Sequence, residues 1–164
     1  MHVIVRTMTS RDGTEVLGIY REGIASGNAT FNTDVPSWAD WDRGHLPFCR
    51  HVAELQGEVL GWAALAPVSE RAVYEGVAEI SIYVGREMRG LGVGARLLAA
   101  LIEEAELAGL WTLQSRIFPE NVGSMNLHRR FGFREVGRRE KLGKLAGQWR
   151  DLLLFERRSS INGL

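Results

Sequence analysis

Cysteine is nearly absent from this chain, which has Cys49 and no second cysteine. An intrachain disulfide is therefore impossible, and a reducing compartment is the natural environment for such a protein. A lone cysteine is more often a small buried apolar residue than a nucleophile, and we expect this of Cys49.

Net charge and long hydrophobic runs are absent as well. The 20 Lys and Arg residues balance 20 Asp and Glu residues, so no global field attracts nucleic acid or an anionic membrane surface. No apolar run approaches the roughly 20 residues that cross a bilayer, and the first residues lack the pattern of a signal peptide. His2, His45 and His51 lie in dissimilar segments and form no metal-binding pattern. We expect a cytoplasmic protein that binds no metal, nucleic acid or membrane.

What is present is an alternation of strand and helix patterns. A chain of 164 residues suits one domain, and we predict a single domain over residues 1–158 with a loose tail at 159–164. Strands on either side of single helices, with a hairpin near the front, predict an α/β mixed sheet covered by helices. The predicted strands are 2–6, 52–55, 59–66, 78–84, 110–118, 133–137 and 149–156. The predicted helices begin after a cap at Thr9 or Ser10 and after Ser37, and two more span 95–108 and 121–131.

Strand 78–84 alternates between apolar and more polar positions. Such alternation places Ile80, Ile82 and Val84 on one face and Glu79, Ser81 and Tyr83 on the other. Helix 95–108 follows with an apolar stripe at helical spacing, formed by Leu97, Leu98, Leu101, Ile102 and Ala105. Both elements are therefore predicted to contribute one face to the core.

Between this strand and this helix lies a glycine-rich loop, Arg89-Gly90-Leu91-Gly92-Val93-Gly94. Alternate glycines let a loop tighten and let a ligand approach the backbone. Unpartnered amides at the start of the next helix favour phosphate or pyrophosphate, although a plain turn has the same composition. The loop lacks the Gly-Lys-Ser/Thr of a P-loop, and its glycine spacing differs from Gly-x-Gly-x-x-Gly of dinucleotide-binding folds.

Arg-Gly-x-Gly-x-Gly after a strand that ends in Tyr83-Val84 resembles the acyl-CoA loop of the GNAT superfamily of N-acetyltransferases. Further segments resemble its phosphinothricin and methionine sulfoximine acetyltransferase branch, in order and over almost the whole chain. These segments are 23–31, 67–71, Tyr74, 78–79, 119–121, 127–128, 132–133 and 149–151.

This resemblance implies a fold and a cofactor, acetyl-CoA. Two central parallel strands would splay apart to admit the cofactor, with backbone hydrogen bonds from a bulge in strand 78–84 and the pyrophosphate on the glycine loop. Asn121 would reach the cofactor from the other side of the cleft, or cap its own helix, or do both. The resemblance also implies a homodimer, with Trp149 near the interface. The expected cofactor residues are Ile82, Tyr83, Val84, Arg89, Gly90, Leu91, Gly92, Val93, Gly94, Ala95, Asn121 and, less directly, Ser124.

The implied chemistry is direct attack of an amine on the thioester, with no acyl-enzyme. Amines are mostly protonated at neutral pH, so a base is required; Glu79 is our candidate, acting through water, and its alternative role is that of an exposed strand carboxylate. A main-chain amide near Val84 would stabilise the oxyanion. His128 is either a general acid or a packing and cofactor contact.

An amino-acid substrate needs a cation for its carboxylate, and we expect Arg71 in this role, although the same residue suits a solvated loop. The predicted substrate-binding residues are Phe31, Ser69, Glu70, Arg71, Tyr74, Glu79, Ile80 and Ser81. The predicted function is N-acetylation of a small amino acid of the phosphinothricin or methionine sulfoximine type. Two alternatives are acetylation of another amine, such as a protein N-terminus or a polyamine, and a non-catalytic acyl-CoA-binding module.

Overall fold

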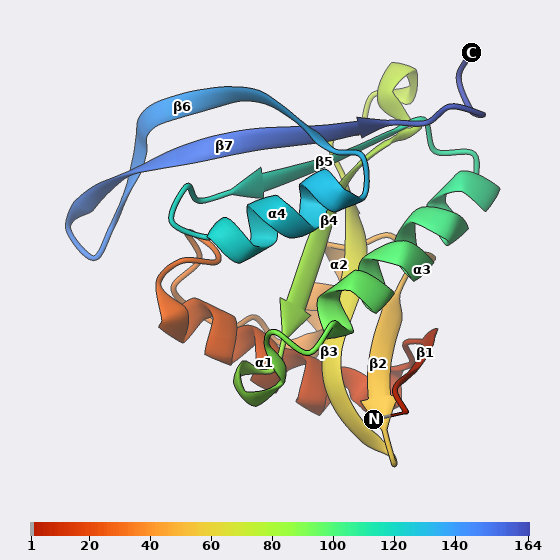
Figure 1. Ribbon diagram of the computed structural model, residues 1–164, viewed down its shortest axis with the longest axis vertical. Helices are drawn as coiled ribbons and strands as arrows, with labels where there is room; N and C mark the ends of the chain where they lie inside the picture. Colours follow the sequence, from red (N-terminus) through yellow and green to blue (C-terminus); the bar gives the residue numbers. More distant parts are fainter. Residues whose placement is uncertain (1) are drawn as a thin grey trace.

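A seven-stranded mixed sheet in the order β1-β2-β3-β4-β5-β7-β6 forms the centre of the computed structural model, which describes residues 2–164 (Figure 1). Only the β4–β5 pair is parallel among the pairings within these residues. This arrangement confirms the predicted mixed α/β class. The strands are β1 Ile4–Thr7, β2 His51–Leu55, β3 Glu58–Pro67, β4 Val77–Val84, β5 Thr112–Ile117, β6 Arg134–Leu145 and β7 Gln148–Arg158. The helices are α1 Gly13–Ser26, α2 Trp38–Arg43, α3 Val93–Leu107 and α4 Val122–Arg130, with short 3-10 turns η1 Ser10–Asp12, η2 Ala72–Tyr74 and η3 Arg86–Met88.

Local signals set several of these boundaries. Ser37 caps α2, since its hydroxyl accepts a hydrogen bond from the Asp40 amide at 3.1 Å. Gly27 ends α1 in the left-handed conformation, at φ 74°. Thr9 caps the short turn η1 through a capping box with Asp12, so α1 begins only at Gly13. The turn η1 itself occupies residues 10–12, which the pattern had assigned to the start of the helix.

Two apolar layers cover the two faces of the sheet. The predicted stripe of α3 packs on one face, where Leu97, Leu98 and Leu101 are fully buried. On the other face α1 and α2 enclose an aromatic cluster that includes the buried Trp41 and Trp62. Cys49 is also fully buried, and burial raises the pKa of its thiol to about 12, which confirms its expected apolar role.

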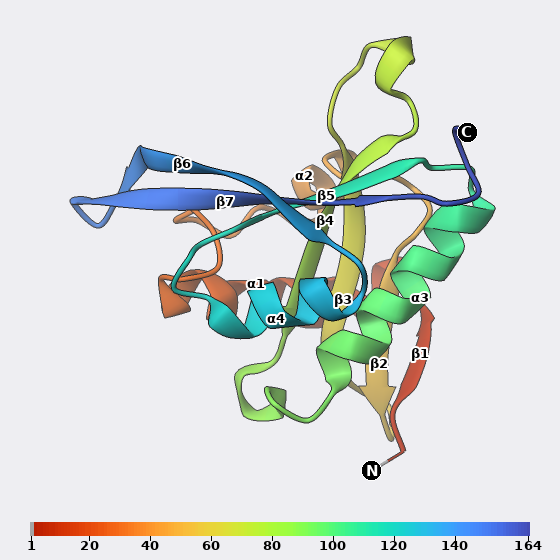
Figure 2. The ribbon, with the colours of Figure 1, turned by 45° about the horizontal axis from the view of Figure 1, so that its top comes forward.

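Strands β4 and β5 separate soon after they begin, and this separation creates the site. They pair only from Val77, opposite Thr112, to Glu79, opposite Gln114. Beyond Glu79 the two strands diverge, as both views show (Figures 1 and 2). The expected bulge in β4 is not observed, because its register with β3 is unbroken from Ala78 to Val84. The edge of β4 that faces β5 becomes free through divergence of the pair and not through an irregularity within β4.

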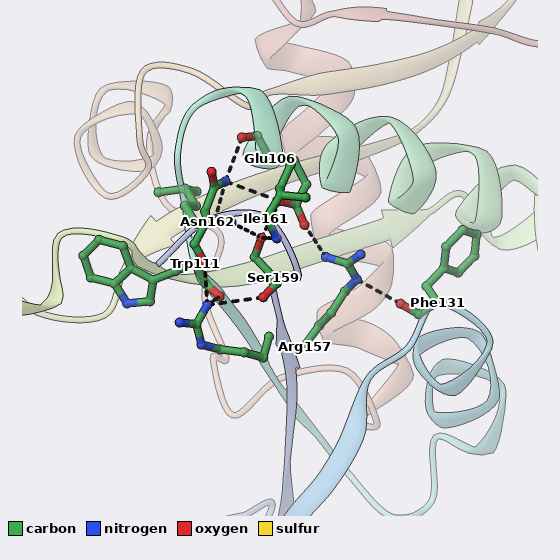
Figure 3. Close-up of polar contacts among 9 residues, drawn as sticks. Glu106, Trp111, Phe131, Arg157, Ser159, Ile161 and Asn162 are labelled. Carbon is green, nitrogen blue, oxygen red and sulfur yellow. Dashed lines mark hydrogen bonds and ion pairs between the residues drawn. The ribbon is translucent and has the colours of Figure 1, made fainter. Parts of the chain in front are cut away.

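The C-terminal part differs most from the sequence prediction. Strands β6 and β7 are longer than expected and form a twisted hairpin that projects from the rest of the sheet (Figure 2). Residues 159–164, expected to form a loose tail, fold back onto the end of α3 (Figure 3). The Ser159 hydroxyl donates to Glu106 at 2.5 Å, and the Asn162 amide nitrogen donates to the Glu106 and Leu110 carbonyls at 2.8 and 3.1 Å. The polar side chains of residues 159–164 therefore make specific hydrogen bonds with the end of α3 and the residues that follow it.

Candidate active site

A cavity of about 740 Å³ lies between the end of β4, the glycine loop and helix α4. Gly90 and Gly92 have φ of 78° and 82°, a region that favours glycine, and open space surrounds the position of a Cβ at either residue. Gly92 is the N-cap of α3, and the first helical hydrogen bond is donated by Arg96. The preceding amides of the first turn, from Val93 to Ala95, have no acceptor within the helix. The loop therefore presents free donors and a helix N-terminus, which together suit a diphosphate.

Most of the predicted cofactor residues line this cavity. Val93 and Gly94 lie in the first turn of α3, so the loop is shorter than the motif suggests. Leu91 is the exception, because it does not line the cavity and its side chain is exposed. Arg130, which was not among the predicted residues, is a second arginine in the lining besides Arg89. The predicted residues that line the cavity are Ile82, Tyr83, Val84, Arg89, Gly90, Gly92, Val93, Gly94, Ala95, Asn121 and Ser124.

Helix α4 forms the second wall of the cavity. Asn121 caps this helix, since its side-chain oxygen accepts from the Ser124 amide at 3.2 Å. Its side-chain nitrogen donates to the Asn28 carbonyl at 3.4 Å, across the opening. Arg150 on β7 ties the same segment down by donating to the Gly27 carbonyl at 2.7 Å. The capping role of Asn121 is confirmed, and a further contact with the cofactor stays a prediction.

A second cavity of about 420 Å³ adjoins the first. Among the predicted substrate-binding residues, Phe31, Glu79, Ile80 and Ser81 line it. The two cavities share the middle of β4 and one side of α4, where a group in one cavity can meet a group in the other. The shared lining consists of Ala29, Ile82, Tyr83, Asn121, Ser124 and His128.

Glu79 lies at the fork between the separating strands. Its carboxylate accepts hydrogen bonds from Arg116 Nε at 2.6 Å and Nη2 at 2.7 Å, and from the Gln114 amide nitrogen at 3.2 Å. A carboxylate offers about four acceptor positions, so one position is left for a water or an amine. Only 20% of the Glu79 side chain is exposed, and the exposure is toward a cavity that it lines. The carboxylate is thus oriented by neighbours and still accessible.

His128 is buried at the junction of the two cavities. Its Nδ1 donates to the Ser124 carbonyl at 2.7 Å, which leaves Nε2 as the unprotonated nitrogen of a neutral ring. Nε2 is itself buried and has no partner among the described residues. Burial lowers the pKa of this histidine, and the bond to Ser124 opposes that shift only in part. A neutral ring in this tautomer has no proton to donate from Nε2.

Four of the predicted substrate-binding residues do not reach the cavity. Ser69, Glu70, Arg71 and Tyr74 lie on the loop between β3 and β4, which projects from the end of the sheet opposite the glycine loop (Figure 2). Arg71 instead packs over the Tyr74 ring, 5.7 Å from its centre. The loop enters β4 at the end where β4 and β5 are still paired, and a role for these four residues in substrate binding stays a prediction. The Arg or Lys that does line the cavity among the described residues is Arg116 on β5, which no sequence motif marks because only the pairing of β4 with β5 brings it to Glu79.

Comparisons with known proteins agree with this geometry. The methionine sulfoximine/methionine sulfone acetyltransferase of Pseudomonas aeruginosa is 32% identical over 162 residues, which cover 95% of this chain and 94% of that protein. A crystal structure of a GNAT superfamily phosphinothricin acetyltransferase from Sinorhizobium meliloti in complex with acetyl-CoA matches with a TM-score of 0.90. It is 27% identical, with 99% of this chain and 91% of that chain covered. A ribosomal-protein-alanine N-acetyltransferase from Brucella melitensis matches with a TM-score of 0.87 at 30% identity, covering 95% and 99% of the two chains.

The family model described as the acetyltransferase (GNAT) family matches residues 20–133. The open glycine cradle and the free amides of α3 fit the diphosphate of acetyl-CoA, and the free edge of β4 fits its extended arm. The chain belongs to the GNAT family, and it is an acetyl-CoA-dependent N-acetyltransferase.

Proposed function

We propose that the acceptor is a small α-amino acid of the methionine sulfoximine or phosphinothricin type. The observation that supports this proposal is an acceptor cavity of about 420 Å³ that holds a single carboxylate, Glu79, next to the cofactor cavity. Its volume suits an amino acid with a short polar side chain. Relatives that act on such amino acids align over nearly the whole chain.

In the proposed mechanism Glu79 accepts a proton from the acceptor ammonium, directly or through one water. Bound acetyl-CoA supplies the activated acetyl group. Backbone amides on the free edge of β4 near Val84 donate, in this mechanism, to the oxygen on which negative charge develops. The residues of the glycine loop bind and orient the cofactor, and helix α4 excludes water from the junction.

His128 acts in this proposal as a buried packing residue and not as a general acid. Its neutral ring packs edge-on against Phe133, with ring centres 5.0 Å apart, and its Nδ1 proton is held by the Ser124 carbonyl. The leaving thiolate of the cofactor needs little protonation, so no acid is required at this position.

Thiol release from acetyl-CoA, measured over a panel of amines, tests the proposal. We expect turnover with methionine sulfone, methionine sulfoximine or phosphinothricin, and a decrease of about 10²–10⁴-fold in kcat for Glu79→Gln. The likeness to a ribosomal-protein-alanine acetyltransferase makes alanine-initiated peptides the necessary competitor. Preference for such peptides or for polyamines would refute the amino-acid substrate, and tight cofactor binding without turnover on any amine would indicate a binding module.

We also propose that the enzyme is a cytoplasmic homodimer. Supporting observations are the projecting β6–β7 hairpin and its Trp149, whose side chain is 55% exposed and lies 4.9 Å from the Lys144 ammonium. The need for acetyl-CoA and the free Cys49 support a cytoplasmic location. Light scattering would test the dimer, with a monomeric mass as the contrary result, and cell fractionation would test the location. Within residues 2–164 no helix is long and apolar enough to span a bilayer.

A further inference from the structure

Arg116 introduces a permanent positive charge into the acceptor cavity. It is the one Arg or Lys among the described residues that line this cavity, and Glu79 is the one Asp or Glu. His45 and His128 also line the cavity, but burial lowers the pKa of both rings and keeps them neutral. The acceptor cavity therefore contains one cation and one anion in direct contact.

The contact leaves part of the guanidinium free. Nε and Nη2 donate to the two Glu79 oxygens, which uses the side edge of the guanidinium. An arginine has five N–H donors, so both protons of Nη1 and one of Nη2 remain free, and one proton of each nitrogen lies on the end edge. The side chain is 57% exposed, and this end edge matches the two oxygens of a second carboxylate.

We propose that Arg116 binds the carboxylate of the acceptor and makes the enzyme selective for amines that carry one. The inference rests on the proposed amino-acid function. An α-amino acid has one ammonium and one carboxylate a few bonds apart, which is the charge pair that Arg116 and Glu79 complement. Binding on the end edge of Arg116 directs the ammonium toward Glu79, the proposed base. In this proposal Arg116 supplies the cation for the substrate carboxylate, a role expected of Arg71 from the sequence.

The test compares methionine sulfone with its carboxamide, which keeps the amine and loses the negative charge. We expect the wild-type enzyme to favour the acid in kcat/KM by about 10- to 100-fold. In Arg116→Gln this preference falls to within about threefold, mainly through KM, and Arg116→Lys keeps part of it. Any loosening of Glu79 affects both acceptors equally and cancels in the ratio of the two preferences.

Arg134→Gln is the matched control, because Arg134 on β6 makes a similar cross-strand ion pair with Glu156 at 2.8 Å, away from the cavity. It is expected to keep the wild-type preference. Acetyl-CoA affinity and thermal unfolding show whether Arg116→Gln is folded. If it is not folded, the preference for the acid over its carboxamide is measured in Arg116→Lys instead.

The outcomes separate the two proposals. An unchanged preference in Arg116→Gln, or in Arg116→Lys if that variant has to decide, would overturn the role of Arg116 while the amino-acid function stands. Loss of the preference in Arg71→Gln instead would also overturn it. If the wild-type enzyme acetylates neither the acid nor its carboxamide, the proposed function itself fails.

Discussion

A methyl group added at Gly23 provides a stringent test of how the active site is built. Gly23 lies in α1, and a Cβ there would come within 2.6 Å of two carbons of the Tyr83 ring. That ring cannot retreat easily, because it stacks on Tyr20 and on Trp62, each with ring centres 5.0 Å away. Gly18, on the same helix, has no atom within 4 Å of the same position. The two glycines therefore form a matched pair.

For Gly18→Ala we expect about 1 kcal/mol of added stability from helix propensity, which raises Tm by roughly 2–4 °C. For Gly23→Ala the same gain is opposed by overpacking of about 1–3 kcal/mol, so stability is unchanged or reduced by up to about 2 kcal/mol. Tyr83 lines both cavities, and its displacement should reduce kcat/KM by about 10-fold or more. Urea unfolding and thiol-release kinetics measure the two effects. Equal stabilisation by both substitutions, with full activity in Gly23→Ala, would refute the packing described here.

Three further predictions concern the loop, the buried histidine and the C-terminal segment. Gly92→Ala should weaken acetyl-CoA binding by about 10-fold in calorimetry, because the Cβ enters the cradle and a left-handed φ costs alanine about 1–2 kcal/mol. The control Gly109→Ala, at a similar φ of 84°, should lower the stability of the protein and leave acetyl-CoA binding unchanged. Burial lowers the folded-state pKa of His128, so at low pH the unfolded chain binds one more proton than the folded chain. The free energy of unfolding is therefore at its full value above about pH 6.5 and falls as the pH drops below it. Chemical unfolding at several pH values should show a shallower fall in His128→Gln, and an equal slope would contradict this. Removal of residues 159–164 should lower the free energy of unfolding by about 2–4 kcal/mol, because Glu106 and the end of α3 lose several hydrogen bonds of about 1 kcal/mol each. An unchanged Tm would mean that the segment is not anchored.

The part of the site that could be predicted is the part in which one continuous segment carries the sequence motif and also forms the binding surface. The glycine loop and the start of α3 are contiguous, so positive φ at Gly90 and Gly92 and free amides follow from local sequence. The acceptor cavity is assembled from α1, β4, β5 and α4, and its charge pair joins residues 37 positions apart. Arg71 lies on the loop before β4, which projects away from the glycine loop (Figure 2), so its role in substrate binding stays a prediction.

Local sequence is enough to predict the alternation of β4, the buried stripe of α3 and the cradle between them, because each depends on a repeat or a turn within a few residues. Which polar groups meet depends instead on the packing of distant segments. The pairing of Glu79 with Gln114, the last pair before β4 and β5 separate, is a property of two strands, and it places Arg116, two residues further along β5, within reach of that carboxylate. In the same way, Ser159 and Asn162 have a loop-like composition and become anchors only because the end of α3 lies within hydrogen-bonding distance. Local backbone preference acts over a few residues, whereas the pairing of distant charges requires the sheet to be formed first.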